Sequence, residues 1–167
     1  MRYVLRLAVM IFAVAMVSCN SSTHPDEVPA PGVTAAFDNI PWVGNSKLQA
    51  YFQLAGAGGP QSLFVSVTDS PPTQVFSFSV RAPSAFTALT PGTYRVSDRT
   101  TDAGFSKNFG NYSTSWSPGS GTLTLNSIST TAKTATGTFT YVVVDQTGTV
   151  SHSITNGKFN VSFEIIQ

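Results

Sequence analysis

The stretch Lys158-Phe-Asn-Val-Ser-Phe-Glu-Ile165 alternates polar and apolar residues one by one. Successive side chains of a β-strand point to opposite faces, so the alternation places Phe159, Val161, Phe163 and Ile165 together on one face. An amphipathic helix would instead need its apolar residues three or four positions apart. The stretch is therefore predicted to be a strand with one buried face and one hydrated face.

The same two-residue period recurs along most of the chain after residue 32, and turn-forming Gly, Pro and Asn separate the repeats. It occurs in residues 47–54, 62–68, 76–80, 122–126 and 138–143. Many short strands at this spacing predict an all-β fold, a single antiparallel β-sandwich of about eight to ten strands over residues 33–167. A β-barrel is the second possibility. Only residues 82–89 are a candidate for a turn of helix.

Asn156-Gly157 allows two interpretations. Both residue types tolerate positive φ, so the pair suits a type I′ turn that joins strands over 151–155 and 158–166. The pair also suits a glycine bulge inside one continuous strand. The sequence leaves both open.

The first 18 residues have the parts of an export signal: Arg2 and Arg6, then an apolar run from Leu7 to Val17. The run is shorter than the roughly 20 residues that a membrane-spanning helix needs. It ends in Met16-Val-Ser-Cys19, which resembles the lipobox of bacterial lipoproteins, and Cys19 is the only cysteine. We therefore predict a cleaved signal helix over residues 1–18 and lipidation of Cys19, whose acyl chains would bind membrane lipid.

Residues 19–32 are rich in Ser and Pro and have no apolar period, so they are predicted to form a disordered tether. In many diderm bacteria an Asp after the lipidated Cys retains a lipoprotein at the inner membrane, and this chain has Asn20 there. That resemblance favours the outer membrane, on its periplasmic or its surface-exposed side.

Charge argues against nucleic acid as a partner. The whole chain has nine basic and eight acidic residues, a formal net charge of +1. Cleavage removes Arg2 and Arg6, which leaves seven basic residues against eight acidic ones, a net charge of about −1. The basic residues are scattered rather than clustered in a stripe.

Four segments have a family resemblance: Gly92-Thr-Tyr-Arg-Val, Gly121-Thr-Leu-Thr-Leu, Gly137-Thr-Phe-Thr-Tyr and Ile154-Thr-Asn-Gly-Lys-Phe-Asn-Val161. They resemble stretches of small, uncharacterised lipoproteins common in Bacteroidota, which have a lipobox, a short tether and one β domain. In those proteins the domain opens near an apolar-Trp pair, which corresponds here to Ile40-Pro-Trp42. The resemblance implies a location and a fold, but no activity.

Residue patterns that would indicate catalysis are sparse. His24 and His152 have no Cys, Asp or Glu at metal-ligand spacing, and neither a metal nor a cofactor is predicted. His152 is interpreted as an exposed strand residue rather than a general base. Asp98 and Asp102 could form a glycosidase pair or offer oxygens to calcium, but two hydrated acids beside Arg95 and Arg99 are the simpler interpretation.

Residues 98–121 are richer in aromatic side chains than the rest of the chain and also contain Asn108 and Asn111. Aromatic faces can stack on sugar rings while amides and carboxylates bind the hydroxyls, which makes this segment a candidate carbohydrate-binding loop. Its candidate ligand-binding residues are Asp102, Phe105, Asn108, Phe109, Tyr112 and Trp116. The alternative is that these aromatics belong to a pair of core strands. Trp42 has the same two interpretations.

The sequence thus predicts a membrane-anchored lipoprotein of the cell envelope, most simply a non-enzymatic binding or structural protein with an envelope protein or a glycan as partner. A carbohydrate-binding module that uses residues 98–121 is the alternative, and a hydrolase comes third.

Overall fold

The computed structural model describes residues 31–44, 46–56, 59–69, 74–85, 87–107, 110–116 and 118–167. The segment interpreted as a signal, residues 1–18, and most of the tether lie outside these residues. The described part of the chain is all β and contains no helix. Its strands are β1 (Gly32–Phe37), β2 (Ile40–Gly44), β3 (Ser46–Gln53), β4 (Ser62–Thr68), β5 (Gln74–Arg81), β6 (Gly92–Arg95), β7 (Thr101–Lys107), β8 (Gly110–Ser113), β9 (Ser120–Ser129), β10 (Thr134–Val144), β11 (Ser151–Ser162) and β12 (Glu164–Ile166).

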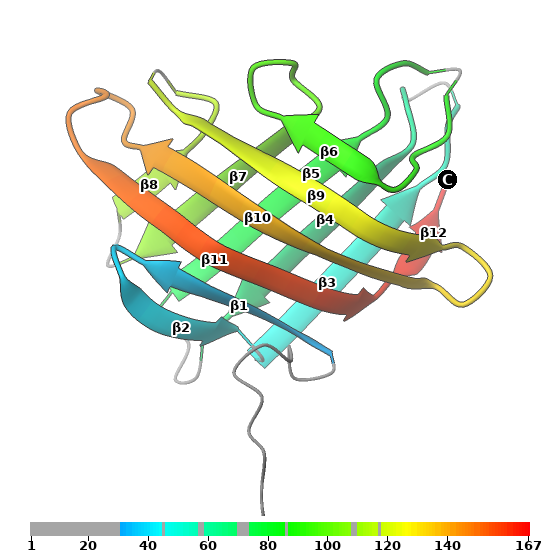
Figure 1. Cartoon of the computed structure of the whole chain (residues 1–167), viewed down its shortest axis with the longest axis horizontal. Coiled ribbons are helices and arrows are strands. Elements are labelled where there is room, and N and C mark those ends of the chain that lie inside the picture. The colour runs from blue at the N-terminus through cyan, green and yellow to red at the C-terminus, as the bar shows by residue number, and fades with distance from the viewer. Residues whose placement is uncertain are drawn as a thin grey trace, which may run out of the picture.

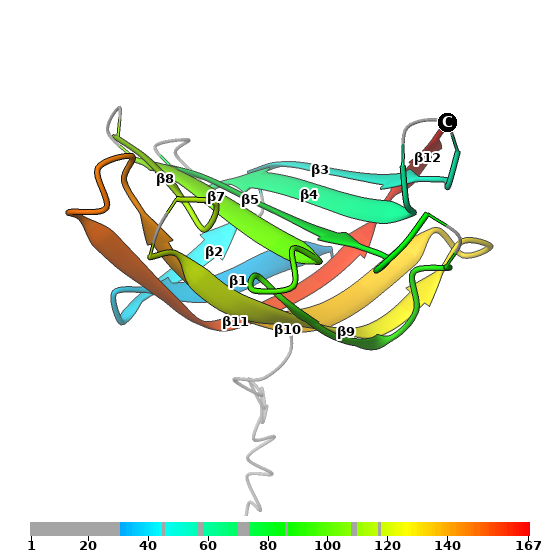
Figure 2. The same cartoon turned by 90° about the horizontal axis from the view of Figure 1, so that it is seen from above.

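The twelve strands form one hydrogen-bonded sheet that folds over itself into two layers (Figures 1 and 2). We call β12, β3, β4, β5, β7 and β8 the back layer, and β6, β9, β10, β11, β1 and β2 the front layer. The front strands cross the back strands at a large angle (Figure 1), as in orthogonally packed sandwiches. The layers meet where Val144 of β10 pairs with Ser113 of β8. The sheet is not closed into a barrel.

The core lies between the layers and is built by the predicted alternation. In β11, Ile154, Phe159 and Val161 are buried, and in β4 Leu63, Val65 and Val67 are fully buried. Aromatic rings from both layers meet in the middle, where Phe76 of β5 stacks on Phe139 of β10 at 5.2 Å between ring centroids. Burial of these apolar side chains on both inner faces holds the sandwich together.

The predicted all-β sandwich is confirmed, with two differences in detail. Twelve strands are found in the described residues instead of eight to ten, because β6, β8 and β12 have only four, four and three residues. Strands this short show no clear alternation in the sequence. The sheet is also mixed rather than purely antiparallel, because β12 pairs with β3 in parallel.

Asn156-Gly157 forms a bulge and not a hairpin turn. β11 continues through the pair, while its register with β10 shifts between Phe139 and Tyr141. The type I′ turn is therefore the wrong alternative and the bulge the right one. β11 is hydrogen-bonded on both sides, to β10 and to β1, and these two neighbours hold it as one strand.

The described residues between 82 and 89 form a turn closed by hydrogen bonds between Ser84 and Thr87, without a helix. Among the residues that the structure describes, no helix has the length and hydropathy needed to cross a membrane.

Candidate functional site

The segment interpreted as a binding loop is largely a strand pair. Residues 101–107 and 110–113 form β7 and β8, which are antiparallel neighbours in the back layer. Phe105 faces the core, is 3 % exposed, and stacks on Phe37 of β1 at 4.4 Å between ring centroids. Phe105 is thus a core residue, as the alternative interpretation of this segment as a pair of core strands expects.

Tyr112 lies directly opposite Phe105 on β8 and is half-buried at the rim of the core. Its ring makes an edge-to-face contact with His152, with 4.4 Å between centroids. Trp116 follows β8 in a turn and is also half-buried, and its carbonyl accepts a hydrogen bond from the backbone of Gly119. Asn108, Phe109 and the lipidation residue Cys19 lie outside the described residues.

Asp102 points to the other side of the back layer, away from Phe105, because the two residues are three positions apart on one strand. Its carboxylate binds Arg81 Nη2 at 2.7 Å and accepts a hydrogen bond from Ser79 Oγ at 3.0 Å. The partner of Asp102 is thus Arg81 on β5, instead of the expected Arg95 and Arg99. Asp102 and Arg81 line a cavity of about 420 Å³ together with Arg99, Thr114 and Ser115.

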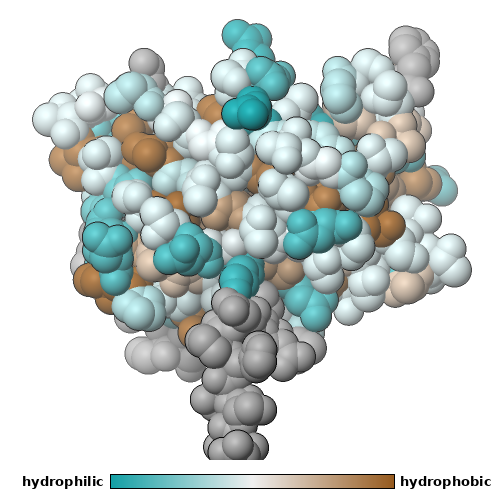
Figure 3. Space-filling view, viewed as in Figure 1, coloured by the Kyte–Doolittle hydropathy of each residue, from teal (hydrophilic) through white to brown (hydrophobic). Residues whose placement is uncertain are grey.

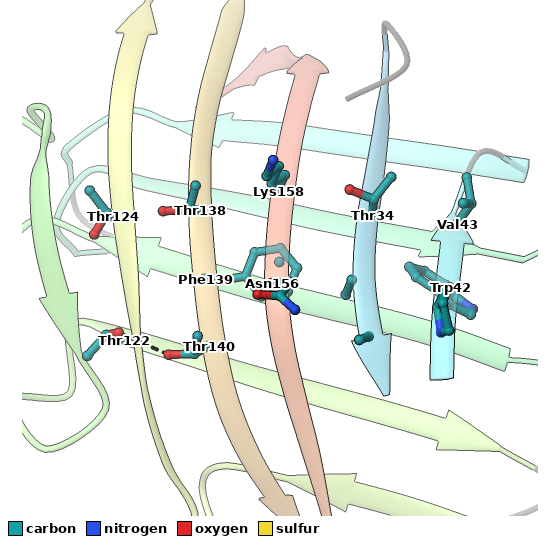
Figure 4. Close-up of a pocket in the computed structure, with 14 residues that line it drawn as sticks. Thr34, Trp42, Val43, Thr122, Thr124, Thr138, Phe139, Thr140, Asn156 and Lys158 are labelled. Atoms are coloured by element: carbon teal, nitrogen blue, oxygen red, sulfur yellow. Dashed lines mark hydrogen bonds between the residues drawn. The ribbon is translucent and has the colours of Figure 1, made fainter. Parts of the chain in front are cut away.

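A larger depression, about 680 Å³, lies on the outer surface of the front layer (Figure 4). We call it the threonine groove. It is lined by Thr34, Ala35, Ala36, Pro41, Trp42, Val43, Thr122, Thr124, Thr138, Phe139, Thr140, Asn156, Gly157 and Lys158. These residues come from five neighbouring strands: β9, β10, β11, β1 and β2.

Strand register brings the polar side chains of the groove into rows. Thr124, Thr138, Lys158, Thr34 and Val43 are successive cross-strand partners from β9 to β2. Neighbours in such a row are about 4.8 Å apart. Beside this row, the hydroxyls of Thr122 and Thr140 are hydrogen-bonded at 3.3 Å, as Figure 4 shows.

The bulge shapes the middle of the groove. Thr155 and Asn156 together lie opposite Thr140, and Asn156 has a φ of 53° and is exposed. Asn156 and Lys158 therefore both reach the groove, while Gly157 between them lies over the ring of Phe139. The side chain of Phe139 itself belongs to the core.

The lining of the groove is polar and contains no carboxylate. Hydroxyl, amide and amine groups donate and accept hydrogen bonds, while Pro41 and the half-exposed Val43 add an apolar end. Figure 3 shows this face of the molecule as mostly pale, with scattered teal and brown residues, so that neither strongly hydrophilic nor strongly hydrophobic side chains dominate it. Such a surface suits an uncharged ligand with many hydroxyls.

The structure also joins two residues that are 114 positions apart. His152 Nδ1 lies 2.5 Å from Asp38 Oδ2, and the backbone N–H of Ser153 donates to Asp38 Oδ1 at 2.8 Å. Burial acts to raise the pKa of Asp38, but the two hydrogen bonds and the charge of Lys107 outweigh it, so the pKa is lowered from its usual value. His152 is half-buried, so its interpretation as an exposed strand residue is corrected.

Sequence reasoning missed this pair because no local spacing connects Asp38 to His152. Among the residues described, no group of three or more His, Cys, Asp or Glu side chains is arranged to hold a metal ion.

Comparison with known proteins gives one match. No curated protein matches the chain, and no solved structure does. Residues 61–161, well over half of the chain, match a family described as a domain of unknown function, DUF6252. The match runs from the residue before β4 almost to the end of β11, so it includes the groove residues of β9, β10 and β11. The chain is therefore a member of the DUF6252 family.

Proposed function

We propose that this protein is a lipid-anchored binding protein of the bacterial cell envelope, without enzymatic activity, of the kind found in Bacteroidota. Met16-Val-Ser-Cys19 supports the anchor, because a thiol at this position behind an apolar run is the nucleophile that lipoprotein processing requires. The following Ser/Pro-rich residues support a tether, and Asn20 supports the outer membrane.

The anchor is tested by mass spectrometry of the mature N-terminus. We expect a chain that starts at Cys19 and carries diacylglyceryl and acyl groups. Cys19→Ala should give a chain that is not lipidated and no longer fractionates with membranes. An unmodified Cys19, or cleavage at another residue, would refute the anchor.

The ligand we propose is a glycan, bound in the threonine groove. The observation that carries this proposal is the groove lining: rows of hydroxyls with one amide and one amine, next to apolar Pro41 and Val43. Sugar rings present hydroxyls at their edges and C–H groups on their faces, so they match both parts of such a surface. Glycans also surround any protein anchored at the outer membrane.

A glycan screen tests the ligand, with the mature chain carrying Cys19→Ser to prevent lipidation. For a glycan that binds, Thr124→Val and Thr138→Val remove one hydroxyl each and keep a β-branched side chain of similar shape. Each should weaken binding by roughly 2- to 10-fold, since one hydrogen bond contributes about 0.5–1.5 kcal/mol. Ser66→Ala, on β4 in the back layer, is the control and should bind as the parent chain does. Unchanged affinity in both threonine variants would exclude the groove as the site.

The 98–121 segment stays a second candidate for the glycan site. The specific observation in its favour is the cavity of about 420 Å³ beside it, which combines the Asp102 carboxylate with Arg81 and Arg99. Trp116→Ala and Asp102→Asn test this location. Loss of binding in these variants, with normal binding in the two threonine variants, would place the glycan here instead of in the groove.

A further inference from the structure

The strand register gives the threonine groove a definite shape. Each of the five strands β9, β10, β11, β1 and β2 contributes one short segment to the lining. The segments are Thr122 with Thr124, then residues 138–140, 156–158, 34–36 and 41–43. In every segment the first and last residues are exposed or half-buried, while the residue between them is buried. The groove is therefore two outward-facing residues wide and five strands long.

This pattern makes the groove elongated, with its long axis across the strands. Neighbouring strands are about 4.8 Å apart, so the four intervals from β9 to β2 cover about 19 Å. Two successive outward-facing residues of one strand are only about 7 Å apart. Figure 4 shows the long direction, in which Thr124, Thr138, Lys158, Thr34 and Val43 follow one another from strand to strand.

Hydroxyl groups line the end of the groove at β9 and β10. The four hydroxyls there belong to Thr122, Thr124, Thr138 and Thr140. Thr93 of the next strand, β6, continues the row, because its hydroxyl is hydrogen-bonded to that of Thr124 at 3.2 Å. A hydroxyl has one donor and two acceptor lone pairs, so each of these groups can form another hydrogen bond to a ligand.

The opposite end of the groove, at β1 and β2, is apolar. Ala36, Pro41 and Val43 face outward there, and Val43 is 46 % exposed. Apolar side chains of this kind pack on the C–H faces of sugar rings. The two kinds of surface thus follow one another along the long axis, so a ligand that contacts both must lie across the strands.

We propose that the threonine groove binds an extended, unbranched glycan chain of about four sugar units that lies across the strands. This rests on the proposed function, the binding of a glycan in the groove. In a β-1,4-linked chain each ring extends the chain by nearly the spacing between two strands, so successive rings would lie over successive strands. The narrow width accommodates one ring but no branch beside it. An α-1,4-linked chain coils, and its rings would leave the row.

Calorimetric titration of the mature chain with Cys19→Ser tests the length of the ligand. The probes are β-1,4-linked oligosaccharides of glucose, mannose, xylose and N-acetylglucosamine, with two, four and six units each. In at least one series the affinity should rise roughly tenfold or more from two units to four and less than about twofold from four to six, because added rings then pass beyond the groove. The α-1,4-linked oligosaccharides of glucose should not show this dependence.

Two results would overturn the proposal and leave the proposed function intact. One is equal affinity for two and four units. The other is the same length dependence in the α-1,4-linked series. Absence of binding in all four β-1,4-linked series would overturn the proposal as well. The groove would still be a glycan site if a glycan of another kind lost affinity in Thr124→Val and Thr138→Val.

Variants at the two ends test whether one ligand spans the groove. Thr124→Val at the β9 end and Val43→Ser at the β2 end should each weaken binding of the tetrasaccharide of that series roughly 2- to 10-fold. Val75→Ser is the matched control, because Val75 is a valine of similar exposure, 41 %, on β5 in the back layer. It should bind as the parent chain does. Weaker binding in Thr124→Val together with unchanged binding in Val43→Ser would show that the ligand occupies one end only, and would overturn the proposal.

Discussion

Gly157 follows the bulge residue Asn156 in β11 and packs closely against the core. It lies in β11 opposite Phe139, and a Cβ atom there would overlap Cδ2 and Cε2 of that ring. Gly157→Ala should therefore force Phe139 out of its position. Overpacking of a filled core costs about 1–3 kcal/mol. Chemical denaturation monitored by fluorescence measures this loss of unfolding free energy.

Gly92→Ala is the control for this change. Gly92 is exposed at the start of β6, and an added Cβ would come no closer than 4.0 Å to another part of the chain. The unfolding free energy of the Gly92→Ala variant should differ from that of the parent chain by less than about 0.5 kcal/mol. Equal stability of the two variants would contradict the close contact at Gly157.

Tyr141 should make the free energy of unfolding decrease at alkaline pH. Its buried hydroxyl is hydrogen-bonded to Thr101 Oγ1 at 2.6 Å. Burial raises the pKa of Tyr141 far above its ordinary value, the Thr101 hydrogen bond opposes this in part, and the charge of Asp102 adds to it. The unfolded chain then loses this proton near pH 10 while the folded chain keeps it, so stability is complete below pH 10 and falls as pH rises further. Melting temperatures measured from pH 8 to 11 should decrease less in Tyr141→Phe than in the parent chain.

The turn of the β1–β2 hairpin is fixed to β11 by a side-chain contact outside the backbone hydrogen-bond ladder. Asp38 in its turn binds the side chain of His152 and the backbone of Ser153, both at the start of β11. Asp38→Ala removes both hydrogen bonds. Amide exchange in β1 and β2 should become roughly 3- to 10-fold faster, the equivalent of about 0.5–1.5 kcal/mol of local stability. Hydrogen–deuterium exchange measures these exchange rates residue by residue.

A fall in pH should also accelerate amide exchange in β1 and β2, as Asp38→Ala does. The pKa of Asp38 is lowered in the folded protein, so its contribution is present above the ordinary carboxyl value and is lost as pH falls through the lowered one. Asp98→Ala is the control, because Asp98 lies in an exposed turn and bonds to its neighbour Ser97. Hairpin exchange that accelerates equally in both variants would contradict a specific role of Asp38.

The long strands could be predicted from the sequence because each has several alternating residues on a core that covers only one face. β3, β4, β5, β10 and β11 all follow this rule. The bulge at Asn156 could not be distinguished from a turn, because that choice depends on β10 and β1, which are distant in sequence.

The candidate sites could not be predicted from local sequence for the same reason. Phe105 is buried because β1 brings Phe37 onto it, and no pattern within residues 98–121 indicates that contact.

The whole sandwich has open sheet edges, and the C-terminal strand covers one of them. After Phe163 the chain passes from the front layer to the back layer, where β12 pairs with β3 in parallel (Figure 1). Glu164, Ile165 and Ile166 lie opposite Tyr51, Phe52 and Gln53, and Leu54 donates a further hydrogen bond to the carbonyl of Ile166. β12 thus occupies backbone groups of β3 that would otherwise form a free edge, and free edges pair with other chains.

Removal of residues 164–167 should therefore have two consequences that differ in their dependence on protein concentration. Loss of the short ladder should lower the unfolding free energy by about 1 kcal/mol, a decrease of roughly 3–5 °C in Tm for a domain of this size. Exposure of the β3 edge should also make the shortened chain self-associate, which sedimentation velocity detects as dimers that increase with concentration. Removal of Gln167 alone is the control, since it lies beyond β12 and should change neither quantity. A shortened chain that stays monomeric at all concentrations would show that another part of the sandwich protects β3.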